Sequence, residues 1–96
     1  MTEIVVTRIP ADPDAERFFT RYRVEVRDGD STTEHDVTVS ARDFERLAGT
    51  RTPEAFVRDC FAFLLERETK ESILRTFDVS AIGRYFPEFE RTIASA

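Results

Sequence analysis

The sequence predicts an α+β fold in which a small antiparallel sheet of three strands, in the N-terminal half, packs against a C-terminal set of three to four helices. Two observations favour this class. Residues 1–40 contain segments in which apolar and polar side chains alternate, which is the period of a half-buried strand. Residues 53–67 carry a long apolar face at helical spacing. Because the chain has 96 residues, of which 41% are apolar and 34% charged, we expect one domain spanning 1–96.

Three strands account for the alternating segments. Residues 3–9 are rich in β-branched side chains and stop at Pro10, so they form the first expected strand. Residues 17–27 form the second, whose expected inward face carries Phe18, Thr20, Tyr22, Val24 and Val26. The third strand, over 33–39, is expected to turn inward Thr33, His35, Val37 and Val39.

The hairpin between the second and third strands has a predictable register. A two-residue loop at Gly29 and Asp30 gives the pairs Val24 with His35, Tyr22 with Val37, and Arg23 with Asp36. A loop longer by one residue would set every apolar side chain against a polar one. The composition of both faces therefore favours the two-residue loop.

Helices are expected after residue 40, where capping signals recur. Ser40 and Asp43 form a variant of the capping box and open a short helix that ends before Gly49. Thr52 and Pro53 open the longest helix, which we expect over about 53–67. Shorter helical segments are expected over 71–76, from Asp78 through Ile82, and over 88–93.

The apolar face of the longest helix is wide. It covers an arc of about 200° and consists of Phe56, Val57, Cys60, Phe61, Phe63, Leu64 and Leu65. A helix that packs on a sheet alone buries a narrower stripe. We therefore expect this helix to be covered on two sides, by the sheet and by the C-terminal segments.

Two residues could carry chemistry, and for both a structural role is the favoured interpretation. Cys60 lies near the middle of the apolar arc, where a thiol behaves as a small hydrophobe. His35 lies on the inward face of the third strand. One histidine, one distant cysteine and scattered carboxylates give neither a metal-ligand spacing nor a nucleophile with its base. We expect no catalytic residue, no metal and no cofactor.

An arginine stripe lies on the outward face of the second strand. It consists of Arg17, Arg21, Arg23 and Arg27, and could contact phosphates. The favoured interpretation is a solvated face neutralised by Glu25, Glu34 and Asp36. The net charge of −5 also weighs against a large nucleic-acid footprint. We therefore do not expect nucleic acid as the main partner.

The aromatic tail is the candidate interaction surface. Tyr85, Phe86 and Phe89 surround Pro87, and the chain contains nine phenylalanines in all. These side chains either fold over the core, which is favoured, or form an apolar knob for a partner.

Three function classes follow from these features. We expect a small non-catalytic binding or adaptor module that docks a protein partner or a second copy of itself. The alternative is a nucleic-acid-associated regulator that uses the arginine stripe. A second alternative is an enzyme whose site is not visible in the sequence.

We expect neither an export signal nor a membrane span. Cys60 has no cysteine to pair with, and no charged and apolar leader precedes the first strand, so a cytoplasmic location is expected. The longest apolar cluster, 61–65, is far shorter than the roughly 20 residues that span a bilayer.

One part of the chain resembles a group of small bacterial proteins of unknown function. The similar segments are residues 63–78 (FLLERETKESILRTFD), 82–89 (IGRYFPEF), 37–47 (VTVSARDFERL) and 52–54 (TPE). The resemblance covers about half of the chain. It favours one compact bacterial domain and implies no activity, ligand or catalytic residue.

Overall fold

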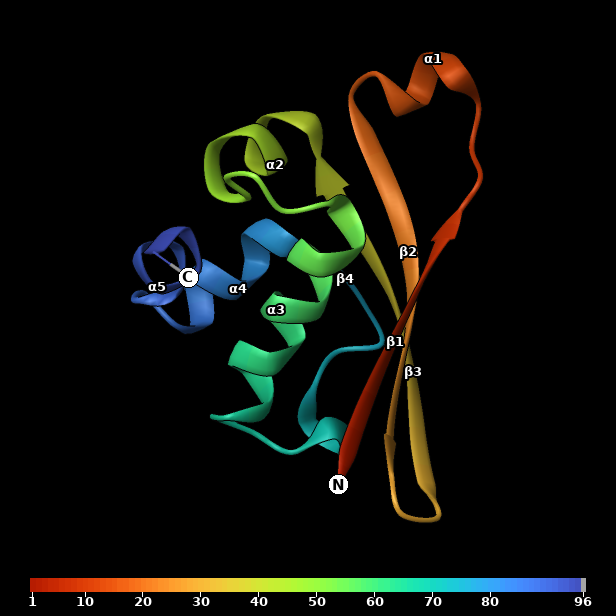
Figure 1. Cartoon of the computed structure of the whole chain (residues 1–96), viewed down its shortest axis with the longest axis vertical. Helices are drawn as coiled ribbons and strands as arrows, with labels where there is room; N and C mark the ends of the chain where they lie inside the picture. Colours follow the sequence, from red (N-terminus) through yellow and green to blue (C-terminus); the bar gives the residue numbers. More distant parts are fainter. Residues whose placement is uncertain (96) are drawn as a thin grey trace.

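One mixed sheet organises the computed structural model, which describes residues 1–95 (Figure 1). Its strands are β1 (Thr2–Ile9), β2 (Phe19–Asp28), β3 (Ser31–Ser40) and β4 (Thr76–Asp78), in the order β1-β2-β3-β4. The first three strands are antiparallel, whereas β4 runs parallel to β3. The α+β class is confirmed. The expected sheet of three antiparallel strands is wrong in detail, because a fourth and parallel strand joins it.

The hairpin of β2 and β3 has the predicted register. Val24 pairs with His35, Tyr22 pairs with Val37, and Arg23 pairs with Asp36. The two-residue loop is possible because Gly29 adopts a positive φ of 62°, which other residues rarely reach. The faces of the strands follow from this pairing, so Tyr22, Val24, Val26, Val37 and Val39 are buried.

The start of the second strand differs from the expectation. The strand begins at Phe19, and Phe18 is 67% exposed instead of facing the core. The preceding residues form a one-turn helix, α1 (Pro13–Glu16), and the Phe18 N–H bonds the carbonyl of Ala15. This turn removes Phe18 from the alternation of the strand. The guanidinium of Arg17 lies 5.6 Å from the centre of its ring.

The two capped helices form as predicted. In α2 (Ala41–Leu47), the Ser40 hydroxyl accepts a hydrogen bond from the Asp43 N–H at 3.0 Å. In α3 (Pro53–Leu65), the Thr52 hydroxyl accepts from the Ala55 N–H at 3.2 Å. The longest helix ends at Leu65, two residues before the expected end, within the usual uncertainty of helix boundaries.

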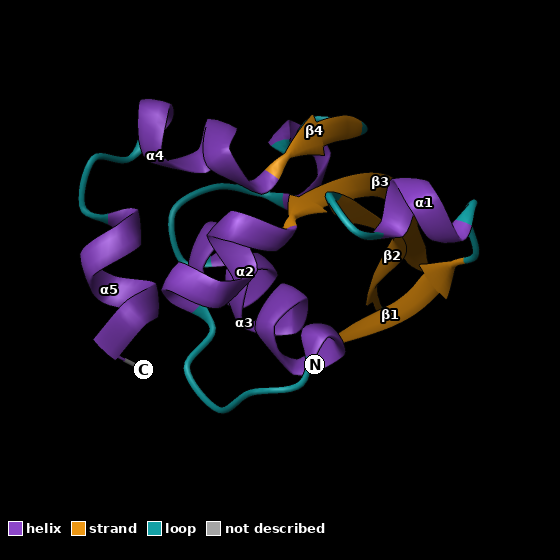
Figure 2. Cartoon of the chain, turned by 90° about the horizontal axis from the view of Figure 1, so that it is seen from above, coloured by secondary structure: helices purple, strands orange, loops and turns teal. Residues whose placement is uncertain are grey.

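Helix α3 is covered on two sides, as its wide apolar arc predicts. It lies between the sheet and the two last helices, α4 (Ile82–Tyr85) and α5 (Phe89–Ser95) (Figures 1 and 2). On the sheet side, the Phe61 ring lies 5.3 Å from the His35 ring and 5.9 Å from the Phe77 ring. On the other side, the Phe63 ring lies 5.1 Å from the Phe89 ring. The core therefore has two layers that share α3.

The expected helix over 71–76 is not formed. One turn of 3-10 helix, η1 (Lys70–Ser72), leads through Ile73 into β4. The backbone of β3 provides the competing interaction, since the Asp36 N–H donates to the Arg75 carbonyl. Pairing with the edge strand β3, whose backbone groups would otherwise be unpaired, stabilises this segment more than the weak helix preference of six residues does. The turn capped by Asp78 is present, because its carboxylate accepts from the Ser80 N–H at 2.9 Å and opens η2 (Val79–Ala81).

A single arginine joins three helical segments. The Arg51 side chain donates to the carbonyls of Leu47, Ala48 and Ile93, and pairs with Asp59 at 2.9 Å. These acceptors belong to the end of α2, to α3 and to α5. The role of Arg51 cannot be seen in the sequence, because its partners lie up to 42 residues away.

Candidate functional site

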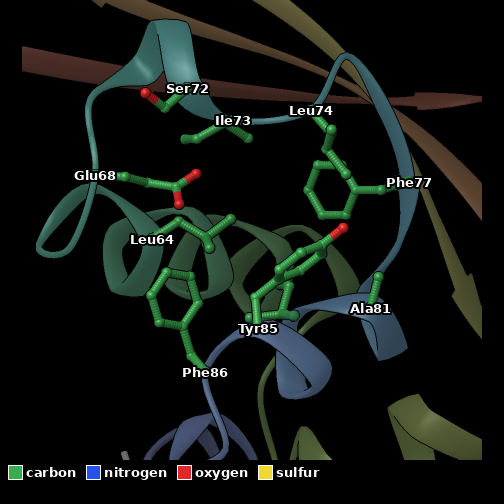
Figure 3. Close-up of a pocket in the computed structure, with 10 residues that line it drawn as sticks. Leu64, Glu68, Ser72, Ile73, Leu74, Phe77, Ala81, Tyr85 and Phe86 are labelled. Atoms are coloured by element: carbon green, nitrogen blue, oxygen red, sulfur yellow. The ribbon is translucent and has the colours of Figure 1, made fainter.

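An apolar groove of about 300 Å³ opens between the segment that carries β4 and helix α4 (Figure 3). Its lining comes entirely from residues 64–86 and consists of Leu64, Glu68, Ser72, Ile73, Leu74, Phe77, Ala81, Ile82, Tyr85 and Phe86. Residues 73–75, which were expected in a helix, instead lead into β4. The parallel pairing of β4 with β3 therefore positions one wall of the groove.

The groove has a buried floor and an exposed rim. Leu64, Ile73 and Ile82 are buried and belong to the core. At the rim, Leu74 is 51% exposed and Tyr85 is 69% exposed. Both rim side chains are large and apolar, and they belong to opposite walls. Solvent contact at such side chains is unfavourable by about 25 cal/mol for each Å² of apolar surface.

One carboxylate belongs to the groove. Glu68 follows α3 and is partly exposed, and Figure 3 shows its carboxylate pointing from the rim toward the apolar side chains. Within residues 1–95 this carboxylate has no ion-pair partner, whereas its neighbours Arg67 and Lys70 pair with Glu88 and Glu71. The groove thus combines apolar walls with one uncompensated negative charge.

The three aromatic residues of the tail have different positions. Phe89 is buried on α5, against Phe63, and so belongs to the core instead of an exposed surface. Phe86 is partly buried and packs edge-on against Phe63 at 6.0 Å. Tyr85 is the most exposed of the three, at 69%. Of the expected interaction surface, Tyr85 and Phe86 line the groove and Phe89 does not.

The arginine stripe is partly neutralised. Arg23 donates to Asp36 at 2.7 Å and to Glu34 at 3.3 Å, and the Asp36 hydrogen bond raises the pKa of Arg23. Arg27 contacts Glu25 at 3.3 Å and Glu3 at 3.5 Å. Arg21 has no ion pair within the part of the chain that the structure describes. Arg17 precedes β2 and lies over Phe18. The arginine stripe therefore does not form one continuous positively charged surface.

The cysteine and the histidine are both buried. Burial raises the pKa of the Cys60 thiol far above its ordinary value, so the reactive thiolate is strongly disfavoured. Both ring nitrogens of His35 are engaged. Nδ1 donates to the Leu74 carbonyl at 2.7 Å, and Nε2 forms a hydrogen bond with the Thr33 hydroxyl at 2.9 Å. His35 thereby attaches the segment before β4 to β3.

Three further features are absent from residues 1–95. Residues 1–95 contain no cluster of three or more His, Cys, Asp or Glu side chains arranged to hold a metal ion. The groove has no basic side chain in its lining that could hold the phosphates of a nucleotide cofactor. Within the described chain, none of the helices has the length and apolar character needed to span a membrane.

Most of the groove could not be identified from the sequence. The sequence points to Tyr85 and Phe86 as surface candidates, but it predicts a helix at Ile73 and Leu74 and does not distinguish Glu68 from the charged residues around it. The available signal was short: Thr76, Phe77 and Asp78 have a β-branched and aromatic character followed by a capping residue. Three residues do not define a strand without knowledge of the sheet edge that pairs with them.

Comparison with known proteins adds no relationship to this geometry. No family model, no curated protein and no solved structure matches the chain.

Proposed function

We propose that the protein is a small binding module whose groove docks an apolar segment of a protein partner that also carries a basic side chain. One observation carries this proposal: two large apolar side chains, Leu74 and Tyr85, stand exposed on the rim of a groove whose floor is apolar. Exposed apolar patches with a polar rim are typical of interaction sites. The proposal extends the function that the sequence favours.

The charge of the groove supports the choice of partner. Glu68 lies at an apolar wall without an ion-pair partner among residues 1–95. A lysine or arginine of the partner would pair with this carboxylate, and an acidic partner would be repelled. The partner's apolar side chains would cover Leu74 and Tyr85.

The size of the groove supports a short segment. At about 300 Å³ the groove lies at the lower end of the range for small-molecule sites, and it holds few polar groups that could orient a substrate. An amphipathic helix inserts two or three side chains from successive turns, which suits a groove of this size.

The two alternatives have weaker support. A nucleic-acid regulator needs a positive surface, but Arg23 and Arg27 are engaged by carboxylates. An enzyme needs reactive groups in a cleft, but Cys60 and His35 are buried and neither lines the groove. We therefore place both after the binding module.

Peptide selection tests the proposal without a known partner. A displayed library of random peptides of about 16 residues would be selected on the wild-type domain and counter-selected on a Leu74→Asp, Tyr85→Asp variant. We expect enriched peptides with apolar residues spaced three or four apart and a nearby lysine or arginine. Synthetic versions should bind the variant at least about tenfold more weakly.

Two controls make the outcome specific. Phe18→Asp removes an aromatic of similar exposure at a site remote from the groove and should leave binding unchanged. Glu68→Lys should weaken an enriched peptide, and a peptide whose basic residue is changed to glutamate should regain binding to that variant. If no peptide distinguishes the wild type from the groove variant, the proposed function is wrong.

A further inference from the structure

The outer edge of β1 is a long and regular sheet edge. The pairing of β1 with β2 continues without a bulge from Thr2 to Ile9, and no other strand among the described residues joins β1 on its far side. In Figure 2, β1 lies at the opposite end of the sheet from β4. Its sequence, TEIVVTRI, contains β-branched residues and only two charges. Most soluble proteins protect such an edge with prolines, bulges or several charges.

The register shows which backbone groups face outward. The two-residue loop closes on a hydrogen-bonded pair of Asp28 and Ser31, so even-numbered residues of β2 bond β3 and odd-numbered residues bond β1. Their partners on β1 are the odd-numbered residues, because Glu25 pairs with Val5. The N–H and C=O groups of the remaining residues therefore point away from the sheet, and these residues are Thr2, Ile4, Val6 and Arg8.

We propose that two copies of this chain associate through antiparallel pairing of their β1 edges, with Val5 opposite Val5 of the second copy. This register pairs all four outward-facing residues of both strands. Registers centred on neighbouring residues leave some of these backbone groups unpaired. A two-fold axis at Val5 would join the two four-stranded sheets into one sheet.

The side chains are compatible with this register. Ile4 faces Val6 of the second copy, and both are partly buried against the core on the helix side of the sheet. On the other side of the sheet, Val5 faces Val5 of the second copy, and Glu3 faces Thr7 of the second copy. Like charges are therefore not set opposite each other, and apolar residues meet apolar residues at the centre. A second copy of the chain is thus a suitable partner for the edge.

One side chain covers the edge in the isolated chain. The Arg58 Nε on α3 donates to the Ile4 carbonyl at 3.4 Å, a long hydrogen bond from an exposed arginine. Pairing of the edges requires this side chain to move aside. Arg58→Ala should therefore strengthen self-association by a few fold. This inference does not depend on the groove, which lies among residues 64–86.

Analytical ultracentrifugation of the full chain tests the proposal. The interface is small, so we expect the average mass to rise from one chain to two between about 1 and 500 µM. Val5→Lys and Val5→Glu each place two like charges about 5 Å apart at the axis and should each give a single-chain mass. An equimolar mixture of the two variants should regain the dimer mass, because opposite charges then meet.

Matched variants separate this contact from loss of folding. Val5→Thr keeps a β-branched side chain and should retain the dimer, and Thr32→Lys adds a charge to β3 away from the edge and should also retain it. Tyr85→Asp should leave the dimer unchanged while it weakens groove binding. A wild type that keeps a single-chain mass at about 500 µM, or a mixture that stays monomeric, would overturn the proposal.

Discussion

Truncation of Phe61 is the sharpest test of how α3 packs on the sheet. Phe61 lies on α3 and is completely buried. Its ring contacts the His35 ring on β3 and the Phe77 ring on β4, at centroid distances of 5.3 and 5.9 Å. Phe61→Ala would therefore remove the contact between the longest helix and the strand that positions the groove.

The expected loss of stability follows from two contributions. Transfer of a phenylalanine side chain out of water contributes roughly 1.5–3 kcal/mol. The truncation also leaves up to roughly 100 Å³ of cavity, which costs about 24 cal/mol for each Å³ that the neighbours fail to fill. Partial collapse reduces the second contribution, so we expect a decrease of about 4 kcal/mol in the free energy of unfolding. This is a large part of the stability of a domain of this size.

Urea denaturation measures this change. With a slope near 1 kcal/mol per M, as is common for small domains, the midpoint of Phe61→Ala should fall by about 3–4 M while the slope stays constant. Phe18→Ala is the matched control, because Phe18 is exposed, and it should change the stability by less than about 0.5 kcal/mol. Equal midpoints for the two variants would remove Phe61 from the core and refute the packing described above.

Three further predictions concern single side chains. Cys60 should react with a thiol reagent only after denaturation, because burial raises the pKa of its thiol; rapid reaction of the folded protein would place Cys60 at the surface. Glu90 accepts hydrogen bonds from Arg46, and these hydrogen bonds lower the pKa of Glu90. The ion pair therefore contributes its full stability above the usual glutamate pKa of about 4.3, and this contribution is lost as the pH falls below that value and Glu90 becomes protonated. The stability difference between wild type and Glu90→Gln should therefore vanish in acid, and a difference that persists there would contradict the ion pair. His35→Leu should speed hydrogen exchange at β4 more than at α3, since the ring donates to the carbonyl of Leu74; equal acceleration in both would mean that His35 serves only to fill space.

The hairpin could be predicted from sequence because its signals are local and mutually consistent. The loop residue Gly29, the alternation of both strands and the charge pair of Arg23 with Asp36 all specify one register. The same holds for α2 and α3, whose caps lie within three residues of the groups they satisfy. Short-range features of this kind need no knowledge of the rest of the fold.

Strand β4 could not be predicted, because the interaction that forms it is distant in sequence. The Asp36 N–H bonds the Arg75 carbonyl and the His35 ring bonds the Leu74 carbonyl, 39 residues along the chain. Locally, residues 71–76 contain good helix formers. The free edge of β3 decides the outcome, since its buried backbone groups require partners.

The groove and the β1 edge have a common physical origin. Four strands leave two outer edges, and the fold treats them differently: the short β4 extends the sheet beside β3, and β1 stays open along eight residues. Because β4 is short, the chain returns immediately to α4, and the exposed Leu74 and Tyr85 remain on either side of the groove. A dimer formed through β1 would leave both grooves free, since they belong to the opposite end of the sheet. The two proposals are therefore compatible in one assembly, in which each copy contributes one groove to a bivalent binding module.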